Sequence, residues 1–180
     1  GLDEAFVTPQ NQSIPWHHLL NQTSEFQGTV WDKPDQADHF RSLSHGDNRR
    51  KGELRQLQAP GSYWEYNDVR INRLSLCLLQ LFKRPLGEVL KEKVLGPIGA
   101  SDQWQWHGYR NAQVQVAGKT LTGVPGGGHW GGGLWIHARD LARLGWLFAN
   151  DGVWAGQRLL PVGWVDKVAT PTALNPDYGY

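Results

Sequence analysis

The most constraining feature of this sequence is a nearly uninterrupted apolar segment at residues 69–83. Its apolar positions recur with the 3.6-residue period of an α-helix, at Ile71, Leu74, Leu78, Leu81 and Phe82. Three more apolar residues widen this stripe until little polar face remains, namely Leu76, Cys77 and Leu79. We therefore predict a central, mostly buried helix with an inaccessible Cys77, around which the rest of the chain must pack.

Shorter patterns predict further helices and one hairpin. A helix is expected at residues 14–20 with Ser13 as its cap, and others are expected after Pro85, in the polar segment at 35–42, and after Pro161. Residues 111–124 alternate apolar and polar around Ala117-Gly118, which is typical of a hairpin. A helix at 138–149 should pack through Leu141, Leu144, Leu147 and Phe148. The prediction is a mainly α fold with a few short strands, and residues 1–180 as one partial domain.

Charge and composition exclude several classes of protein. Lys and Arg number 18 against 17 Asp and Glu, with one basic cluster at 49–51, so no face is built to bind a series of phosphates. The longest apolar run is about half the roughly 20 residues that a membrane span needs. His107, His129 and His137 are too widely spaced for a zinc pair on one helix. We expect neither nucleic acid, nor a membrane span, nor a metal.

Candidate chemistry centres on Tyr66-Asn67-Asp68, between the Pro60-Gly61 turn and the apolar helix. In an extended segment the side chains of residues i and i+2 lie on the same side, so the Tyr66 hydroxyl and the Asp68 carboxylate would converge. A phenol with an ordinary pKa near about 10 is a poor base unless a cation lies beside it. The alternative is that Asp68 caps the helix and Tyr66 is a half-buried aromatic, and both descriptions can hold together.

A second candidate is the glycine-rich run at residues 126–133. It could form a backbone wall of a pocket in which His129 and Trp130 contact substrate, or it could be a flexible connection. A third string, Gly118-Lys119-Thr120, fails as a phosphate loop because Gln113 stands where that motif needs glycine.

Four strings, in order, resemble one family. Residues 60–68, Pro-Gly-Ser-Tyr-Trp-Glu-Tyr-Asn-Asp, resemble the Pro-Gly-x-x-Phe-x-Tyr-Ser-Asn motif of serine β-lactamases, penicillin-recognising carboxypeptidases and related esterases and amidases. Residues 14–24 are similar to that family's Ile-Thr-Ile-Arg-His-Leu-Leu-Thr-His-Thr-Ser segment, residues 94–100 to its Ile-x-x-Pro-Leu-Gly-Met, and residues 138–143 to its Ser-Ala-x-Asp-Leu-Ala-Arg. The resemblance is strongest to the 6-aminohexanoate-dimer-hydrolase and esterase branch.

The resemblance implies roles for particular residues. Tyr66 matches the tyrosine that works with a lysine as base, and Asp68 stands where the family usually has Asn. We expect Trp64, His129 and Trp130 to contact substrate. The family's nucleophile is the serine of Ser-x-x-Lys, and none of the seven serines here has a lysine three positions later. The nucleophile is therefore expected outside this chain, upstream, and a third motif beyond Tyr180.

The same resemblance implies a helical lobe beside an α/β lobe, whose sheet residues 175–180 would enter. The implied chemistry is hydrolysis of a small ester or amide through an acyl-enzyme, without a cofactor, and the implied partner is the remainder of the polypeptide or a complementary fragment. With no methionine and a start at Gly1, the natural amino terminus and any signal peptide are expected to be missing. The compartment therefore stays open, with the resemblance alone favouring the bacterial periplasm. The alternative function is a non-catalytic module whose ten tryptophans bind a glycan or peptide.

Overall fold

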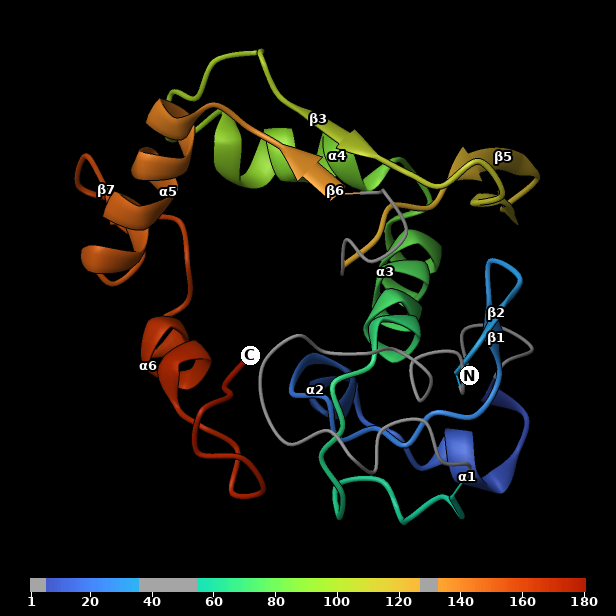
Figure 1. Ribbon diagram of the computed structural model, residues 1–180. Helices are drawn as coiled ribbons and strands as arrows, with labels where there is room; N and C mark the ends of the chain where they lie inside the picture. The colour runs from blue at the N-terminus through green and yellow to red at the C-terminus, as the bar shows by residue number, and fades with distance from the viewer. Residues whose placement is uncertain (1–5, 36–54, 127–132) are drawn as a thin grey trace.

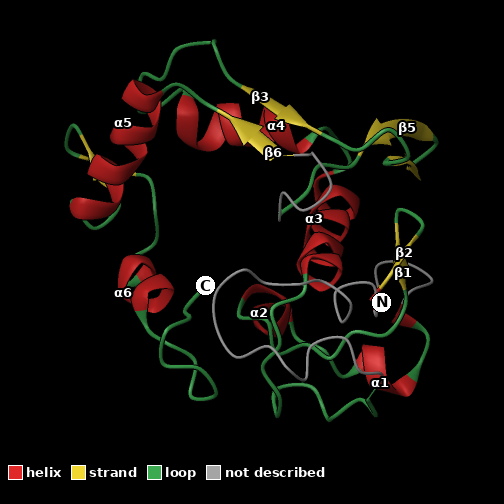
Figure 2. Ribbon diagram, viewed as in Figure 1, coloured by secondary structure: helices red, strands yellow, loops and turns green. Residues whose placement is uncertain are grey.

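The computed structural model describes residues 6–35, 55–126 and 133–180. Helix α3 (Asp68–Phe82) stands at the centre of the chain, and the other elements are arranged around it as an open arc (Figures 1 and 2). Helices α1 (Pro9–Gln12) and α2 (Trp16–Leu20) lie at its amino-terminal end. The predicted mainly α fold with short strands agrees with this architecture.

Helix α3 begins at Asn67, whose side chain accepts a hydrogen bond from the backbone N–H of Arg70, and ends at Lys83 in the left-handed conformation. The predicted inaccessibility of Cys77 agrees with its fully buried side chain. The prediction was wrong for Leu81 and Phe82, which are 51% and 40% exposed, whereas Arg70 is buried. The amino-terminal half of α3 is buried through two kinds of side chain: charged ones that pair with neighbouring segments, such as Arg70, and apolar ones that pack in the core, such as Val69.

All strands of the described ranges pair in twos and antiparallel. The predicted hairpin is confirmed as β4 (Gln113–Val116) and β5 (Lys119–Thr122), and Ala117 and Gly118 between them have φ of 50° and 76°. Such positive φ values suit the tight turn that a two-residue hairpin needs. The other pairs are β1 (Thr29–Val30) with β2 (Lys33–Pro34), and β7 (Val153–Trp154) with β8 (Gln157–Arg158).

Strand β6 (Gly133–Trp135) pairs with β3 (Gln105–His107) and was not predicted, since the glycine-rich run before it carries no strand signal. The pairing brings segments that are far apart in sequence to the same side of the arc (Figure 1). Helix α5 (Ala138–Ala149) follows it and has the predicted bounds. Of its predicted core residues, Leu147 is buried, but Leu141 and Phe148 are exposed, which corrects that expectation.

The remaining helices depart in detail from the prediction. Ser13 ends α1 instead of capping α2, and the side chain that caps α1 is Thr8. Helix α4 (Leu86–Leu90) continues as a wider π-helical turn, η3 (Lys91–Leu95), and α6 (Trp164–Ala169) follows Pro161. The helix expected at 35–42 falls almost entirely outside the described residues.

Two apolar cores hold the arc. The larger joins α2 and α3 to the hairpin, through Leu19, Phe26, Val69, Leu79 and Val116 among others. The smaller joins η3 to α5 through Leu95, Ile98 and Leu147. Within the described ranges, no helix is long and apolar enough to cross a membrane.

Candidate functional site

The Tyr66 segment runs beside residues 22 and 23 and is hydrogen-bonded to them at three points. The backbone N–H of Gly61 donates to the Thr23 carbonyl at 2.8 Å, and that of Glu65 donates to the Gln22 carbonyl at 3.0 Å. The backbone N–H of Asn67 donates to Oε1 of Gln22, also at 3.0 Å. Two of the four motif strings found in the sequence therefore lie against each other in space.

The turn that opens this segment fits closely over α2. Gly61 has a φ of +86°, and a Cβ atom placed on it would lie 2.6 Å from Nε2 of His18. Nδ1 of His18 is 3.0 Å from the Thr23 hydroxyl. Burial of the imidazole, together with the neighbouring His17, lowers the pKa of His18 from its ordinary value of 6.5. Both the backbone conformation at residue 61 and this contact with the His18 ring favour glycine there.

A buried network of ionic groups lies on the other side of the segment. Nη1 of Arg70 donates to Glu25 at 2.8 Å and to Glu65 at 2.9 Å. Arg55 donates to both oxygens of Glu25 at 2.6 Å, and to Glu65 at 3.1 Å. The side chains of Arg70 and Glu25 are 1% and 0% exposed. Glu65, the residue before Tyr66, is thus fixed by two arginines.

Burial and hydrogen bonding act in opposite directions on Glu25. Burial alone raises the pKa of its carboxyl, but hydrogen bonds from Arg55 and from the Gln58 backbone N–H, with the charges of Arg70 and Arg55, outweigh burial and lower the pKa. The same pairing with Glu25 raises the pKa of Arg55. The folded chain therefore favours the charged form of Glu25, and the ion pairs of Glu25 stabilise the fold only while its carboxylate is ionised.

Tyr66 itself is half-buried and belongs to a cluster of three aromatic rings. The ring of Tyr178 lies 6.3 Å from that of Tyr66, edge to face, and 5.5 Å from that of Trp64. The indole N–H of Trp64 is buried without a hydrogen-bond partner among the described residues. The predicted Tyr66 and Trp64 are thus brought together, and Tyr178 joins them from the carboxyl-terminal end of the chain.

Asp68 is buried in the first turn of α3, directly after the residue that caps the helix. The expectation that Asp68 is the cap was wrong, because Asn67 has the extended backbone and the capping side chain. The amide of Asn67 also donates to the Asp35 carbonyl at 2.9 Å. An acidic group in the first turn is favoured by the helix dipole.

The glycine-rich run begins against α3. The backbone N–H of Gly126 donates to Oδ1 of Asn72 at 2.8 Å, and Nε1 of Trp106 donates to the carbonyl of the preceding Pro125 at 3.1 Å. The predicted contacts His129 and Trp130 lie outside the described residues. The start of the run is therefore anchored one turn along the helix that Tyr66 precedes.

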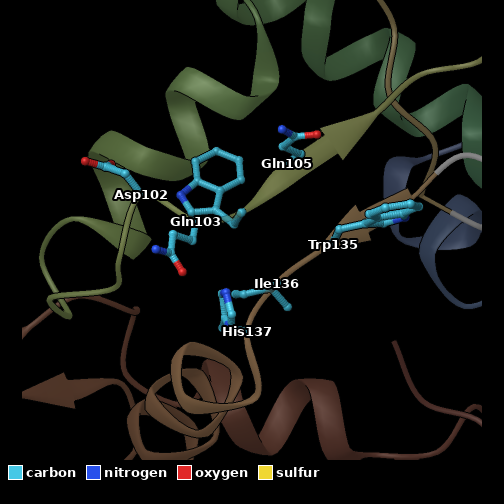
Figure 3. Close-up of a pocket in the computed structure, with 7 residues that line it drawn as sticks. Asp102, Gln103, Gln105, Trp135, Ile136 and His137 are labelled. Carbon is cyan, nitrogen blue, oxygen red and sulfur yellow. The ribbon is translucent and has the colours of Figure 1, made fainter.

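A separate pocket of about 510 Å³ lies between β3, β6 and the start of α5 (Figure 3). Trp135 on its rim is 67% exposed, and its ring meets that of His107 at 4.6 Å, edge to face. The lining combines aromatic and polar side chains: Asp102, Gln103, Trp104, Gln105, Trp135, Ile136 and His137. None of these residues was predicted as a pocket residue.

In the part of the chain that the structure describes, no group of three or more metal-binding side chains gathers.

The structure thus brings together a Tyr-Asn-Asp triplet at the start of a buried helix and the first residue of a glycine-rich run, which is anchored on the same helix. A family model described as Beta-lactamase matches residues 4–179. The chain therefore belongs to the β-lactamase family of serine hydrolases and penicillin-binding proteins.

Solved structures share this fold at low sequence identity. A protein from Bacteroides dorei DSM 17855 that carries the name β-lactamase aligns with a TM-score of 0.57 and 15% identity over 91% of this chain and 45% of its own. One from Bacillus anthracis, named as a 6-aminohexanoate-dimer hydrolase, gives 0.57 and 17% over 91% and 43%. A penicillin-binding protein from Bacillus halodurans gives 0.51 and 19% over 93% and 56%. No curated protein matches in sequence. The chain thus spans roughly half the length of these structures.

Sequence reasoning missed three groups that shape the site. Gln22 lay within a recognised string, but its spacing to residue 67 gives no signal of contact. Arg70 was hidden by the apolar pattern of its helix. Tyr178 follows Pro176-Asp177, which predicts a turn but does not predict which segment the following residues contact.

Proposed function

We propose that this chain contributes the tyrosine-bearing helical part of a serine hydrolase that cleaves ester or amide bonds through an acyl-enzyme. The observation that supports it most is the fixed position of Tyr66, because hydrogen bonds hold the backbone on both sides of it at the start of α3. In this proposal the nucleophilic serine and its lysine come from outside residues 1–180. Asp68, buried in the first turn, would orient that lysine by its charge.

The proposed reaction follows from these roles. With a lysine beside it, Tyr66 would be favoured as phenolate and would take the proton of the serine as the serine attacks the carbonyl. Backbone N–H groups would stabilise the tetrahedral oxyanion, the leaving group would depart with a proton, and water would then hydrolyse the acyl-enzyme. The indole N–H of Trp64, with no partner among the described residues, would be available to a substrate acceptor.

The proposal is tested on the full-length gene product that contains this sequence. With p-nitrophenyl esters we expect a burst of nitrophenol equal to the enzyme concentration, and a mass increase of one acyl group on a serine. Steady turnover with no burst and no acyl adduct on rapid quenching would contradict an accumulating acyl-enzyme. Loss of both signals on changing a serine of Ser-x-x-Lys would identify the nucleophile.

The Trp135 pocket supports a second candidate, a glycan-binding module. An exposed indole beside amide and carboxylate side chains suits the apolar face and hydroxyl groups of a sugar. Titration calorimetry with soluble oligosaccharides would detect binding that Trp135→Ala abolishes and Trp146→Ala, at another exposed indole, leaves unchanged. Equal heats for all three proteins would rule this candidate out.

A further inference from the structure

We infer that Gln22 is a positioning residue for Tyr66, acting as a clamp that holds the backbone on both sides of it. This inference rests on the proposed function for its catalytic meaning, but the contacts themselves are independent of it. The Gln22 carbonyl accepts from the N–H of Glu65, and the Gln22 side chain accepts from the N–H of Asn67. One residue therefore bonds to both chain neighbours of Tyr66.

The burial and the backbone conformation of Gln22 both suit this role. It is 2% exposed, and its φ of 63° places it in the left-handed region, which non-glycine residues seldom occupy. Such strain persists where surrounding contacts over-determine the conformation. The left-handed backbone is part of the geometry in which carbonyl and side chain of one residue reach N–H groups two positions apart. Because the side chain is buried, the Asn67 N–H would lose a protein acceptor if the Gln22 amide were removed.

The clamp leaves the Tyr66 side chain as the part of the segment that it does not hold. Glu65 is fixed further by Arg55 and Arg70, and Asn67 by its bonds to Arg70 and Asp35. All of these contacts act on the neighbours, and the ring of Tyr66 meets Tyr178. Because a displacement of about 1 Å at a reacting group can cost about 100-fold in rate, the clamp would matter to catalysis without touching substrate.

The test uses the full-length gene product labelled with 3-fluorotyrosine. The Tyr66 resonance is the one that disappears in Tyr66→Phe. Gln22→Met keeps the side-chain length but removes the acceptor, and Gln22→Asn keeps an amide too short to reach Asn67 while suiting the left-handed backbone. In both variants we expect the Tyr66 resonance to move by more than its line width, and kcat to fall about 10- to 100-fold with KM within about threefold.

Gln22→Glu should restore both signals, because it keeps an acceptor of the right length beside the favourable amino-terminal end of α3. Gln10→Met is the matched control, since Gln10 donates to the carbonyls of Glu25 and Gln58 and not to the neighbours of Tyr66. An unmoved Tyr66 resonance in both loss variants, or a displaced one that Gln22→Glu does not restore, overturns the inference. If the resonance moves and is restored while Tyr66→Phe retains its kcat, the clamp stands and the catalytic role of Tyr66 fails.

Discussion

At the scale of single residues, the site depends on which atoms of Tyr66 and its neighbours are fixed. Its backbone neighbours are held by Gln22, and its ring packs edge to face against Tyr178. A change to the hydroxyl should therefore affect chemistry, and a change to the backbone should affect the fold. Activity measurements and unfolding measurements can distinguish these two effects.

We expect Tyr66→Phe in the full-length gene product to lower kcat by about 10²–10⁴-fold, the usual contribution of general-base assistance, with little change in binding. Stability should fall by no more than one hydrogen bond, about 0.5–1.5 kcal/mol. Steady-state kinetics with parallel thermal melts measure both effects. Near-normal kcat would remove the catalytic role of Tyr66.

In Asp68→Asn, which restores the usual family residue, a large loss of kcat would mean that the charge orients the lysine, and a modest effect would mean that Asp68 acts mainly on the helix.

Gly61→Ala should destabilise the chain more than Gly99→Ala does. Both glycines have positive φ, 86° and 67°, where an L side chain costs about 1–2 kcal/mol. A Cβ on Gly61 also meets His18, whereas a Cβ on Gly99 meets nothing within 4 Å. Urea unfolding of the two variants isolates the contact with His18. Equal losses in the two would show that the His18 ring moves aside freely.

At the scale of elements, α3 combines an apolar carboxyl-terminal half with an amino-terminal half that carries buried charge. The side chain of Arg70 pairs with both Glu25 and Glu65, and so links α3 to the segment after α2. Breaking one member of a buried ionic group leaves the others without compensation. The stability of α3 should therefore depend strongly on Arg70, although the apolar period of the helix gives no sign of this.

Arg70→Leu should cost about 3–5 kcal/mol, since it leaves Glu25 and Glu65 buried with one arginine fewer. Arg84→Leu is the control, because Arg84 pairs with Glu92 at sites 38% and 46% exposed and such pairs contribute about 1 kcal/mol or less. Denaturant unfolding gives both values. A loss for Arg70→Leu as small as that for Arg84→Leu would mean that solvent reaches the network.

Stability should decline in two stages as pH falls. The pKa of His18 lies below 6.5 in the folded chain, so its contribution is complete above pH 6.5 and is lost as pH falls below that value. The lowered pKa of Glu25 gives a contribution that is complete above its ordinary 4.5 and is lost as pH falls through the folded value. In melts from pH 8 to 3, His18→Gln should flatten the upper stage and Glu25→Gln the lower. Identical curves for the two variants and the unmodified chain would contradict both assignments.

Sequence patterns predicted the elements whose stability is local and failed where distant segments meet. Helix α5 and the hairpin turn at Ala117-Gly118 carry their signals within a few residues. The burial of Arg70 depends on Glu25, 45 residues away, which no local pattern encodes. Tyr66 and Trp64 could be named from their motif, but Tyr178 and Gln22 required the fold. The cap at Thr8, followed by Pro9, is a local sequence signal for a helix start, although no helix was predicted there.

At the scale of the whole molecule, the two cores leave large apolar side chains in solvent. Trp135, Trp146, Leu141 and Val162 are all exposed on the arm that holds the smaller core. The family match spans the chain, while the related structures are roughly twice as long. We propose that the entry of residues 175–180 into the sheet of a second lobe, and the contribution of the nucleophile from outside, account together for this surface.

The 180-residue chain alone should lack hydrolase activity, because a lone Tyr66 cannot replace a covalent step. Purified chain incubated with p-nitrophenyl acetate should match the buffer rate, with the Tyr66→Phe chain as its control. Hydrolysis that survives purification and is abolished only by changing one of the seven serines would refute this expectation.

The hydrogen bond from Asn67 to Gln22 also has a consequence for the order of folding. Helix α3 can form within about a microsecond from local contacts, but the clamp must bring together residues 45 apart in the chain. The entropy of closing that loop is lost before the bond is gained, so the clamp forms in a later and slower step. We therefore expect α3 to form before the segment that holds Tyr66 reaches its fixed position, so a partly folded chain would contain the helix without the site.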